Sequence, residues 1–552
     1  MDSNLRMLLA VVLTFLVFFV YQVFFGRPPE ISTKQQVEQP QEETVAQDKN
    51  VQPLGETVAT IKKPEARPAI KGRTIAVSTP FYTASFTEEG ATLKDFKLNK
   101  YRETIQPDSP MKLLISAQSP EERSLAIGFV NHKIQGLDDA VFHADTERSV
   151  IDATNKQKSL SFSWDSPQGY RIVKTYTFYP DNYLFDLEVK VGNPFPKALK
   201  DNLTLAVIYR QDNSSESHYI FSGPSILVDN KLKELSEKDI SKRDLYSGRI
   251  DWFALGDRYF ITAVIPEDEK KEASVRLEQG AEQLLKAVHI DPTGTIPPQT
   301  ERSYRYHIYI GPKSLDILSS VDKKLSKAID FGWFDILAKP LLHILNFLNR
   351  YIHNYGLAII ILTILIKIVF WPLSNKSYKS MSDMKKLQPK MTELRQKYKG
   401  DKQTMNKELM NLYKTYNINP LGGCLPMVLQ IPVFFAFYKM LYQSIELRHA
   451  PFFGWINDLA APDRLFNFDF SIPFMEPPYG IPVLTIIMGA SMFLQQKMSP
   501  PPGDPAQAKI MMAMPIVFTF IFINFPSGLV LYWLVNNILS IAQQYYVTKK
   551  TA

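Results

Sequence analysis

One charged residue lies inside an otherwise apolar stretch of the chain, where its type and position could do chemistry that its neighbours cannot. This residue is Lys367, in segment 356–373, which reads GLAIIILTILIKIVFWPL. A lysine at this depth in a membrane helix costs about 2.5–3.5 kcal/mol on insertion scales. Segments 421–445 and 477–503, and the chain after Asp504, contain no Asp or Glu that could pair with it.

Two environments could accommodate this lysine. Its stem could extend toward cytoplasmic lipid headgroups, although Lys367 lies six residues from the cytoplasmic end, about 9 Å at the helical rise. The alternative, which we favour, is a hydrated cavity open to the cytoplasm, in which an unpaired cation attracts a passing carboxylate. Polar residues on several helices could line it, although helix-to-helix hydrogen bonds also explain each of them. They are Thr363, Gln430, Thr519, Asn524, Asn536, Asn537 and Ser540.

The sequence lacks the motifs of the common catalytic classes. It contains no G-x-S-x-G, H-E-x-x-H, P-loop or G-x-G-x-x-G motif, and its histidines show no metal-ligand spacing. The chain contains a single cysteine, Cys424, which excludes a disulfide scaffold and Cys-ligated zinc or iron–sulfur sites. Cys424 lies in an apolar run. We therefore expect no enzymatic activity, no metal and no cofactor.

The N-terminal part of the chain predicts a membrane anchor and a tether. The chain has 552 residues, too many for one ordinary domain. Segment 7–25 has 19 residues and no charge, so it is long enough to cross a membrane as a helix. No A-x-A site follows, which favours an uncleaved anchor over residues 1–26 rather than a cleaved signal peptide. Segment 27–73 is rich in Pro, Gln and Glu, and we predict a disordered tether.

A β-rich domain is predicted over residues 74–330. Segments 174–178 and 184–191 alternate apolar and polar residues, and turn signals such as PDN at 180–182 separate the strands. We expect an antiparallel β-sandwich with one helical interruption near residues 231–242. An all-β domain of this kind more often binds a peptide or a protein than performs catalysis, although fold alone does not identify the ligand.

The C-terminal part predicts an α-helical membrane core. Segment 331–354 is apolar on one face only, which is typical of an amphipathic helix lying in the membrane interface. Residues 355–552 contain five candidate spans, which together with the N-terminal anchor make six. The five are 356–373, 421–442, 479–497, 509–525 and 527–547, and the last two are expected to form a tight helical hairpin.

The charge of the connecting segments predicts the topology. Segment 374–420 contains 11 Lys and Arg against 4 Asp and Glu, whereas segment 445–478 contains 2 against 5. By the positive-inside rule, the basic segment and both termini are cytoplasmic and the acidic segment is external. The β domain is then external, on the periplasmic side.

The basic segment 374–420 also carries a helical pattern. Met381, Met384 and Met391 belong to an apolar series with steps of three and four, and a second series follows the Gly400-Asp401 break. We predict an antiparallel pair of amphipathic helices whose outer face is rich in lysine, including Lys385 and Lys386. The pair could simply pack on itself. It could also dock on anionic headgroups, ribosomal RNA or a nascent chain, because methionines form a deformable apolar surface.

Several motifs, in this order along the whole chain, closely resemble those of the YidC membrane protein insertases. They are PDNY at 180–183, IDWF at 250–253, NPLGGCLP at 419–426, QIP at 430–432, QKMSP at 496–500 and FPSGLVLYW at 525–533. The resemblance is to Gram-negative members with a large periplasmic domain. It implies a multi-pass inner-membrane insertase and chaperone whose periplasmic domain is a β-supersandwich.

The resemblance also implies roles for particular residues. In the family, a positive residue of the first core span sits in a hydrophilic groove, and Lys367 matches that position, where the usual residue is Arg. Substrate contacts along this groove transfer to Thr363, Gln430, Tyr532 and Trp533. The implied partners are nascent membrane proteins, the Sec translocon, the ribosome or signal recognition machinery, and the phospholipid bilayer, with no sequence-specific nucleic acid.

Three other functions fit the residues less well. A secondary transporter would usually show an internal repeat and a coupling carboxylate, and the sequence shows neither. A periplasmic chaperone with one anchor would explain the β domain but not five further spans. A hydrolase would need catalytic motifs that the chain lacks.

Overall fold

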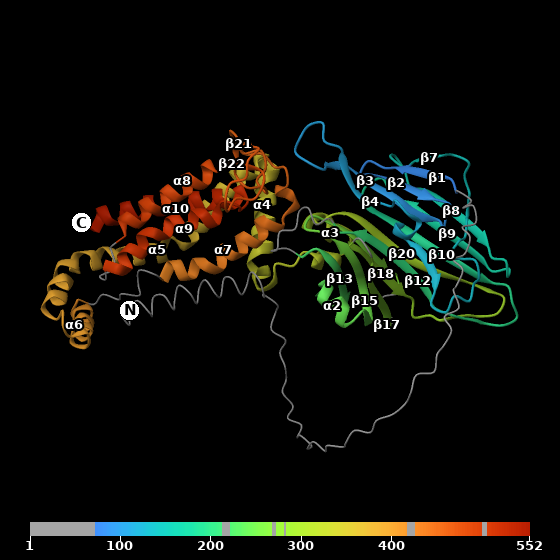
Figure 1. Cartoon of the computed structure of the whole chain (residues 1–552), viewed down its shortest axis with the longest axis horizontal. Helices are drawn as coiled ribbons and strands as arrows, with labels where there is room; N and C mark the ends of the chain where they lie inside the picture. The colour runs from blue at the N-terminus through green and yellow to red at the C-terminus, as the bar shows by residue number, and fades with distance from the viewer. Residues whose placement is uncertain are drawn as a thin grey trace, which may run out of the picture.

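The computed structural model describes residues 72–211, 221–267, 272–280, 283–416, 425–499 and 505–551. The predicted N-terminal anchor and residues 27–71 of the predicted tether lie outside this description, as do motif residues 419–424 and Pro500. The described chain forms a β-rich half and a helical half, which follow one another along the long axis of the molecule (Figure 1).

Two sheets make up most of the β-rich half. The smaller sheet has the strand order β4 (Met111–Ser116), β3 (Thr92–Arg102), β2 (Tyr82–Thr87), β1 (Thr74–Ser78) and β7 (Val150–Asp152). The larger sheet has the order β5 (Ala126–Phe129), β12 (Leu203–Arg210), β18 (Leu284–Ile290), β17 (Glu272–Gln279), β15 (Leu245–Gly256), β16 (Phe260–Pro266), β20 (Thr300–Pro312), β10 (Leu184–Asn193), β9 (Arg171–Phe178), β8 (Lys158–Asp165) and β6 (His143–Ala144). Strand β13 (Gly223–Val228) pairs with β15 and with β14 (Lys231–Glu234), and β11 (Leu199–Lys200) pairs with β19 (Thr295–Ile296).

The alternating segments of the sequence form the strands that they predict. Strands β9 and β10 pair antiparallel, and every second residue of each is buried. The buried face of β10 meets the smaller sheet, because the ring of Phe185 lies 6.2 Å from that of Phe86 and 6.4 Å from that of Phe96. The two sheets therefore share an aromatic core, since burying one face of each removes its apolar side chains from water.

Two details of the β-rich half differ from the expectation. Strands β1 and β7 pair in parallel, so the smaller sheet is not wholly antiparallel. The helix predicted near 231–242 is only half helix, because Lys231–Glu234 is strand β14 and helix α2 spans Glu237–Lys242. Ser236 and Asp239 form a capping box that starts α2 at this point.

Strand β15 pairs with different strands along its two halves. Its first half, Leu245 to Arg249, pairs with β17, and its second half, Phe253 to Gly256, pairs with β16. In the strand order, β17 and β18 therefore follow β15 in one direction, and β16 and β20 follow it in the other.

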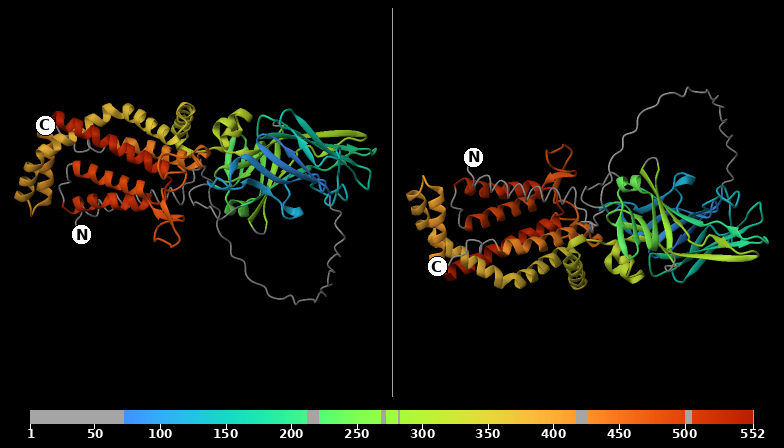
Figure 2. Two further views of the ribbon diagram at one scale, coloured as in Figure 1. Left: turned by 90° about the horizontal axis from the view of Figure 1, so that it is seen from above. Right: turned by 90° about the horizontal axis from the view of Figure 1, so that it is seen from below.

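The helical half follows α3 (Leu315–Val321). It contains α4 (Asp335–Ile352), α5 (Tyr355–Lys397), α6 (Lys402–Thr415), α7 (Leu425–Gln443), α8 (Val483–Met498), α9 (Pro505–Phe522) and α10 (Ser527–Thr551), and a small hairpin of β21 (Leu465–Phe468) and β22 (Tyr479–Ile481). Helices α5, α7, α8, α9 and α10 run alongside one another, with α6 at the end remote from the strands (Figure 2). Helix α10 packs against both α5 and α8.

Helix α5 is longer than the span predicted at 356–373. It continues for 43 residues to Lys397, through Pro372 and Pro389, so the membrane segment and the first helix of the basic segment are one element. Among the described residues, α5 alone is both long and apolar enough to cross a membrane, and the apolar part of α9, Ala508–Phe522, is shorter. The other spans remain predictions.

One predicted span begins too early. The prediction starts it at residue 479, whereas Tyr479–Ile481 is strand β22 and α8 begins at Val483. Prolines 477, 478 and 482 explain the difference, because proline lacks a backbone donor and restricts the residue before it to extended conformations.

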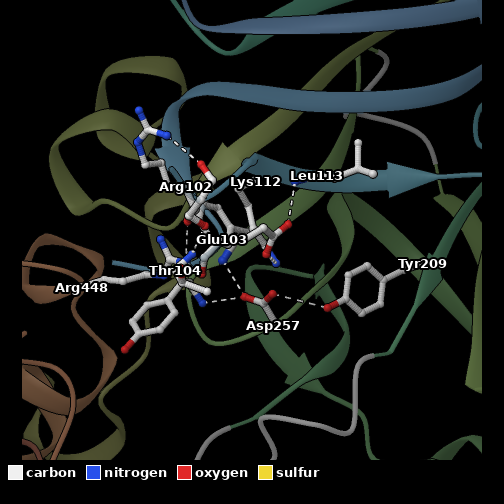
Figure 3. A network of polar contacts seen from close by, with 11 residues as sticks. Arg102, Glu103, Thr104, Lys112, Leu113, Tyr209, Asp257 and Arg448 are labelled. Carbon is white, nitrogen blue, oxygen red and sulfur yellow. Dashed lines mark hydrogen bonds and ion pairs between the residues drawn. The ribbon is translucent and has the colours of Figure 1, made fainter. Parts of the chain in front are cut away.

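The β-rich half contacts the helical half through a polar joint (Figure 3). Arg448 lies shortly after the end of α7. Its Nη2 donates to the carbonyl oxygens of Arg102 at 2.8 Å and of Glu103 at 2.9 Å. Arg258 in turn donates from Nε to the carbonyl of Tyr442 at 2.5 Å. We call these contacts the Arg448 joint. They link the end of β3 to the segment after α7, and the β15–β16 turn to the last turn of α7.

Candidate functional site

Lys367 lies on α5 with its side chain directed toward α10. The residue is 5% exposed, and its Nζ atom donates to Oγ of Ser540 at 2.6 Å. The Ser540 hydroxyl donates in turn to the carbonyl of Asn536 at 2.7 Å, so its single proton is used and its oxygen is left to accept from the lysine. The lysine is therefore held by a neutral acceptor on another helix.

A second hydrogen bond extends this contact to α7. Nε2 of Gln430 donates to Oδ1 of Asn536 at 2.9 Å. Lys367, Ser540, Asn536 and Gln430 thus connect α5, α10 and α7, and we refer to these four residues as the Lys367 cluster.

Within the described residues, no carboxylate forms an ion pair with Lys367, and its ammonium group donates to the hydroxyl of Ser540. An ammonium group with one neutral acceptor retains two N–H donors for further partners. The cluster can therefore attract and bind an anionic group, and it contains no base or nucleophile arranged for a chemical reaction.

The structure places Thr363 one turn before Lys367 on the same face of α5. Its side chain is 1% exposed, and its hydroxyl donates to the carbonyl of Ile359 at 2.7 Å. The hydroxyl is thus engaged within its own helix, a common arrangement for threonine in helices. Contact between Thr363 and a substrate remains a prediction.

Tyr532 and Trp533 lie where α10 meets α7. The ring of Tyr532 is buried and stacks on that of Phe437, with centroids 4.3 Å apart and planes at 13°. The indole of Trp533 packs edge-on against Phe434 at 4.7 Å and lies 5.2 Å from Phe522 of α9. The structure thus shows both residues packing helices together, and a substrate role for either stays a prediction.

The other predicted polar residues do not join the cluster. Asn537 donates to Ser491 of α8 at 3.0 Å, and Thr519 donates to the carbonyl of Pro515 in its own helix. Asn524 lies between α9 and α10, where its Oδ1 accepts from Arg464 at 3.2 Å.

One polar contact near the cluster is absent from the prediction. Nε2 of Gln543 donates to Oδ1 of Asn375 at 2.8 Å and to the carbonyl of Trp371 at 3.3 Å. Asn536, Ser540 and Gln543 follow one another at steps of four and three, so they share one face of α10. That spacing is the sequence signal that would have identified Gln543.

The predicted apolar series of the basic segment brings α5 and α6 together. Met391 and Leu387 of α5 pack with Leu409 of α6, and the hydroxyl of Tyr413 lies 3.8 Å from the sulfur of Met391. Met381 and Met384 are half-buried, whereas Lys385 and Lys386 are exposed. The binding role of this pair of helices remains a prediction.

No metal site is found in the part of the chain that the structure describes. There, no three residues of the types His, Cys, Asp and Glu lie close enough together to hold an ion.

Comparisons with known proteins relate both halves of the chain to one family. The model described as "YidC periplasmic domain" matches residues 74–344, and that described as "60Kd inner membrane protein" matches residues 347–552. The chain is 43% identical to the membrane protein insertase YidC of Syntrophobacter fumaroxidans over 99% of both chains. It is 41% identical to the same protein of Pelobacter propionicus over 99% of both.

Among solved structures, the chain is similar to a crystal structure of an active YidC insertase with its first transmembrane domain resolved. The TM-score is 0.38 with 18% sequence identity, and the match covers 86% of this chain and 95% of the other.

Proposed function

The chain belongs to the YidC family of membrane protein insertases, and we propose that it uses the Lys367 cluster to receive short external segments of new membrane proteins. Family membership makes it an inner-membrane insertase with a periplasmic domain, and not an enzyme. Insertases of this family act on nascent membrane proteins in the lipid bilayer.

The proposal rests on the burial of Lys367 and on the hydrogen bond that its side chain makes. It is a buried cation on the apolar helix α5, and it donates to the neutral hydroxyl of Ser540. A cation held without a carboxylate keeps its attraction for an acidic segment of a client protein.

In the proposed mechanism, a short and weakly charged external segment enters a hydrophilic groove lined by Lys367, Thr363, Gln430, Tyr532 and Trp533. Hydration of the groove and local thinning of the bilayer lower the cost of moving polar groups partway across. The adjoining apolar helix then partitions sideways into lipid, which contributes about 25 cal/mol per Å² of apolar surface. The membrane potential assists the transfer of acidic segments, by about 2.3 kcal/mol per elementary charge for each 100 mV.

The proposed topology has six spans with both termini in the cytoplasm. The proposed domains are an anchor over 1–26, a tether over 27–73, a periplasmic β-supersandwich over 74–330, an interfacial helix over 331–354 and a five-span core over 355–552, with a cytoplasmic hairpin at 374–420. The exposed apolar side chains of Trp333, Ile336, Phe347 and Tyr351 support an interfacial position for this segment.

We further propose that the exposed Lys385 and Lys386 help the cytoplasmic hairpin recruit clients, with the ribosome or the signal recognition machinery delivering them. The half-buried Met381 and Met384 add an adaptable apolar surface, whereas Met391 holds the two helices together. The Sec translocon is the proposed partner for clients with large external domains.

The proposal is tested by insertion into proteoliposomes. Purified full-length protein is offered a single-span client with an acidic external segment, and protease protection of that segment is measured. Lys367→Arg, Lys367→Ala and Lys367→Glu are compared with Lys497→Ala, a control that removes a lysine at the end of α8, where its Nζ lies 5.0 Å from the ring of Phe493.

We expect Lys367→Arg and Lys497→Ala to insert the client, and Lys367→Ala and Lys367→Glu to fail. Normal insertion by Lys367→Ala would mean that the charge is dispensable, and that hydration and membrane thinning suffice. Failure of the unaltered protein would contradict insertion in this minimal form and favour a chaperone role beside the Sec translocon.

A further inference from the structure

The connection between α7 and α8 exposes several large aromatic side chains. It spans residues 444–482 and contains the hairpin of β21 and β22. Phe466 on β21 is 68% exposed, and Phe470 and Phe474, between the two strands, are 64% and 83% exposed. We call these three residues the hairpin phenylalanines. Exposed apolar side chains of this size in one short segment mark a surface that contacts lipid or protein.

The backbone of the hairpin is strained at two of these residues. Phe466 has φ 57° and Phe474 has φ 65°, in the left-handed region that side chains other than glycine rarely adopt. Opposite Phe466 the chain has Gly480, where the carbonyl of Phe466 leaves no room for a Cβ atom. The fold thus keeps two exposed rings in an unfavourable conformation, which indicates a role other than stabilising the protein itself.

Polar contacts fasten the hairpin to the segment that joins α9 to α10. Arg464 donates from Nη1 to the carbonyl of Ile523 and from Nε to the carbonyl of Pro478, both at 2.8 Å. Nδ2 of Asn524 donates to the carbonyl of Phe474 at 3.0 Å. The exposed rings are therefore carried by a segment that is held in a fixed position relative to the helices.

The connection lies level with the ends of the long helices. The carboxylate of Asp463 accepts from the backbone N–H groups of Leu484 and Thr485, in the first turn of α8. Gly356, at the start of α5, has no room for a Cβ atom, because the ring of Phe452 occupies that space. The connection thus meets α5 where its apolar segment begins and α8 where that helix begins.

Exposed apolar side chains continue from the connection along two neighbouring helices. On α8 they include Ile486 and Ile487, and at the end of α9 they include Phe520 and Ile521. Figure 2 shows the connection projecting sideways from the helical half, at its end nearer the strands and on the side opposite α4. A bilayer that covers the exposed sides of α8 and α9 would therefore meet the hairpin at its boundary.

The composition of the hairpin indicates which occupant fits. Residues 465–481 include two acidic residues and no Lys or Arg, so the hairpin offers no cation for an anionic headgroup. Its binding must then come from burial of apolar surface, which aromatic side chains provide at the boundary between headgroups and acyl chains. We propose that the hairpin phenylalanines insert into the external leaflet of the bilayer and anchor this side of the helical half. The inference rests on the proposed topology but not on the Lys367 cluster.

The test measures the depth of the hairpin in full-length protein in phosphatidylcholine nanodiscs without a client. In a Cys424→Ala background, Ser471→Cys places a nitroxide spin label between Phe470 and Phe474. Electron paramagnetic resonance then compares its collisions with oxygen, which concentrates in lipid, and with a water-soluble nickel complex. Ile487→Cys on α8 and Lys97→Cys on the exposed face of β3 carry the reference labels.

We expect the label at residue 471 to collide preferentially with oxygen, as at residue 487, whereas the label at residue 97 prefers nickel. The double variant Phe470→Ser and Phe474→Ser should lose this preference and match residue 97. Leu113→Ser, which changes an exposed apolar residue of β4, is the matched control and should retain it. An unchanged unfolding temperature shows that a variant still folds.

Three results would overturn the inference. One is a preference for nickel at residue 471 while residue 487 prefers oxygen, and a preference for nickel at both positions would contradict the proposed topology as well. Another is shielding of residue 471 from both reagents, which would mean that protein covers the hairpin. The third is an unchanged preference for oxygen in the double variant, which would mean that the phenylalanines do not hold the hairpin in the lipid.

Discussion

Lys367 and Ser540 lie 173 residues apart in the sequence, yet Nζ of the lysine is 2.6 Å from Oγ of the serine. This contact joins α5 to α10, and the hydrogen bond between Asn536 and Gln430 continues it to α7. A buried cation thus has a neutral partner, which keeps it in place without cancelling its charge. That combination distinguishes a site that attracts anions from a structural ion pair.

Removing the serine hydroxyl should destabilise the helical half. In Ser540→Ala the ammonium group of Lys367 loses its acceptor, and we expect the free energy of unfolding to fall by about 1–3 kcal/mol. Thermal unfolding of the full-length protein in nanodiscs measures the change. Ser540→Thr retains the hydroxyl and serves as the control, and equal stability of Ser540→Ala and Ser540→Thr would contradict the importance of the contact.

The hydrogen bond between Gln430 and Asn536 should appear as an energetic coupling. In a double-mutant cycle with alanine at each position, we expect a coupling of about 0.5–1.5 kcal/mol in unfolding free energy. Asn537 provides the control, because it bonds to Ser491 and not to Gln430. A cycle of Gln430→Ala with Asn537→Ala should be additive, and equal coupling in the two cycles would count against the specific bond.

A buried lysine in the β-rich half predicts a dependence of stability on pH. Lys174 is 0% exposed, and its Nζ donates to the carbonyls of Ala91 at 2.6 Å, Leu125 at 2.8 Å and Gly90 at 3.2 Å. Burial lowers the pKa of Lys174 from 10.5 to about 7. Between these two pH values the unfolded chain binds more protons at this residue than the folded chain, so the lysine makes stability rise with pH.

The contribution of Lys174 is therefore least favourable below about pH 7 and grows until about pH 10.5. We expect Lys174→Met to reduce the slope of unfolding free energy against pH in this window by about one proton. Unfolding of the full-length protein at a series of pH values measures the slope. Lys97→Met, on the exposed face of β3, is the control, and equal slopes for Lys174→Met and the unaltered protein would refute the prediction.

The Arg448 joint should control how firmly the two halves are connected. Arg448 bonds to the carbonyls of Arg102, the last residue of β3, and of Glu103, and its guanidinium lies 5.6 Å from the ring centroid of Phe260. Hydrogen bonds from charged donors contribute about 1.5–3 kcal/mol, so Arg448→Ala should raise amide exchange around residues 102–103 markedly. Hydrogen–deuterium exchange is the measurement, with Arg243→Ala, at the C-terminal end of α2, as the control. Unchanged exchange at 102–103 would show that the joint does not hold β3.

Local patterns in the sequence predict local structure well. The alternation at 184–191 predicts β10, and the apolar steps in the basic segment predict the contact of Met391 with α6. Prediction is less accurate where a helix-breaking residue lies in a segment whose other residues favour a helix. Pro372 suggests the end of a helix, yet α5 continues through it, because proline removes one hydrogen bond that a long packed helix can do without.

Contacts between distant segments were beyond prediction. Gln430, Asn536 and Ser540 are named by the sequence as candidates, but their alignment with Lys367 depends on how α5, α7 and α10 pack. The strand order around β15 arises in the same way, since its two halves pair with different strands, β17 and β16. Neither the helix packing nor the strand order follows from the local periodicity of a single segment.

A charge exchange between insertase and client tests the central claim most directly. Lys367→Glu is offered two single-span clients that differ only in whether the external segment carries aspartates or lysines, and protease protection in proteoliposomes without a membrane potential is measured. We predict that Lys367→Glu fails with the acidic client and recovers insertion of the basic one, while the unaltered protein shows the opposite preference. Equal insertion of both clients by both proteins would contradict the claim that the charge at residue 367 draws the external segment into the membrane.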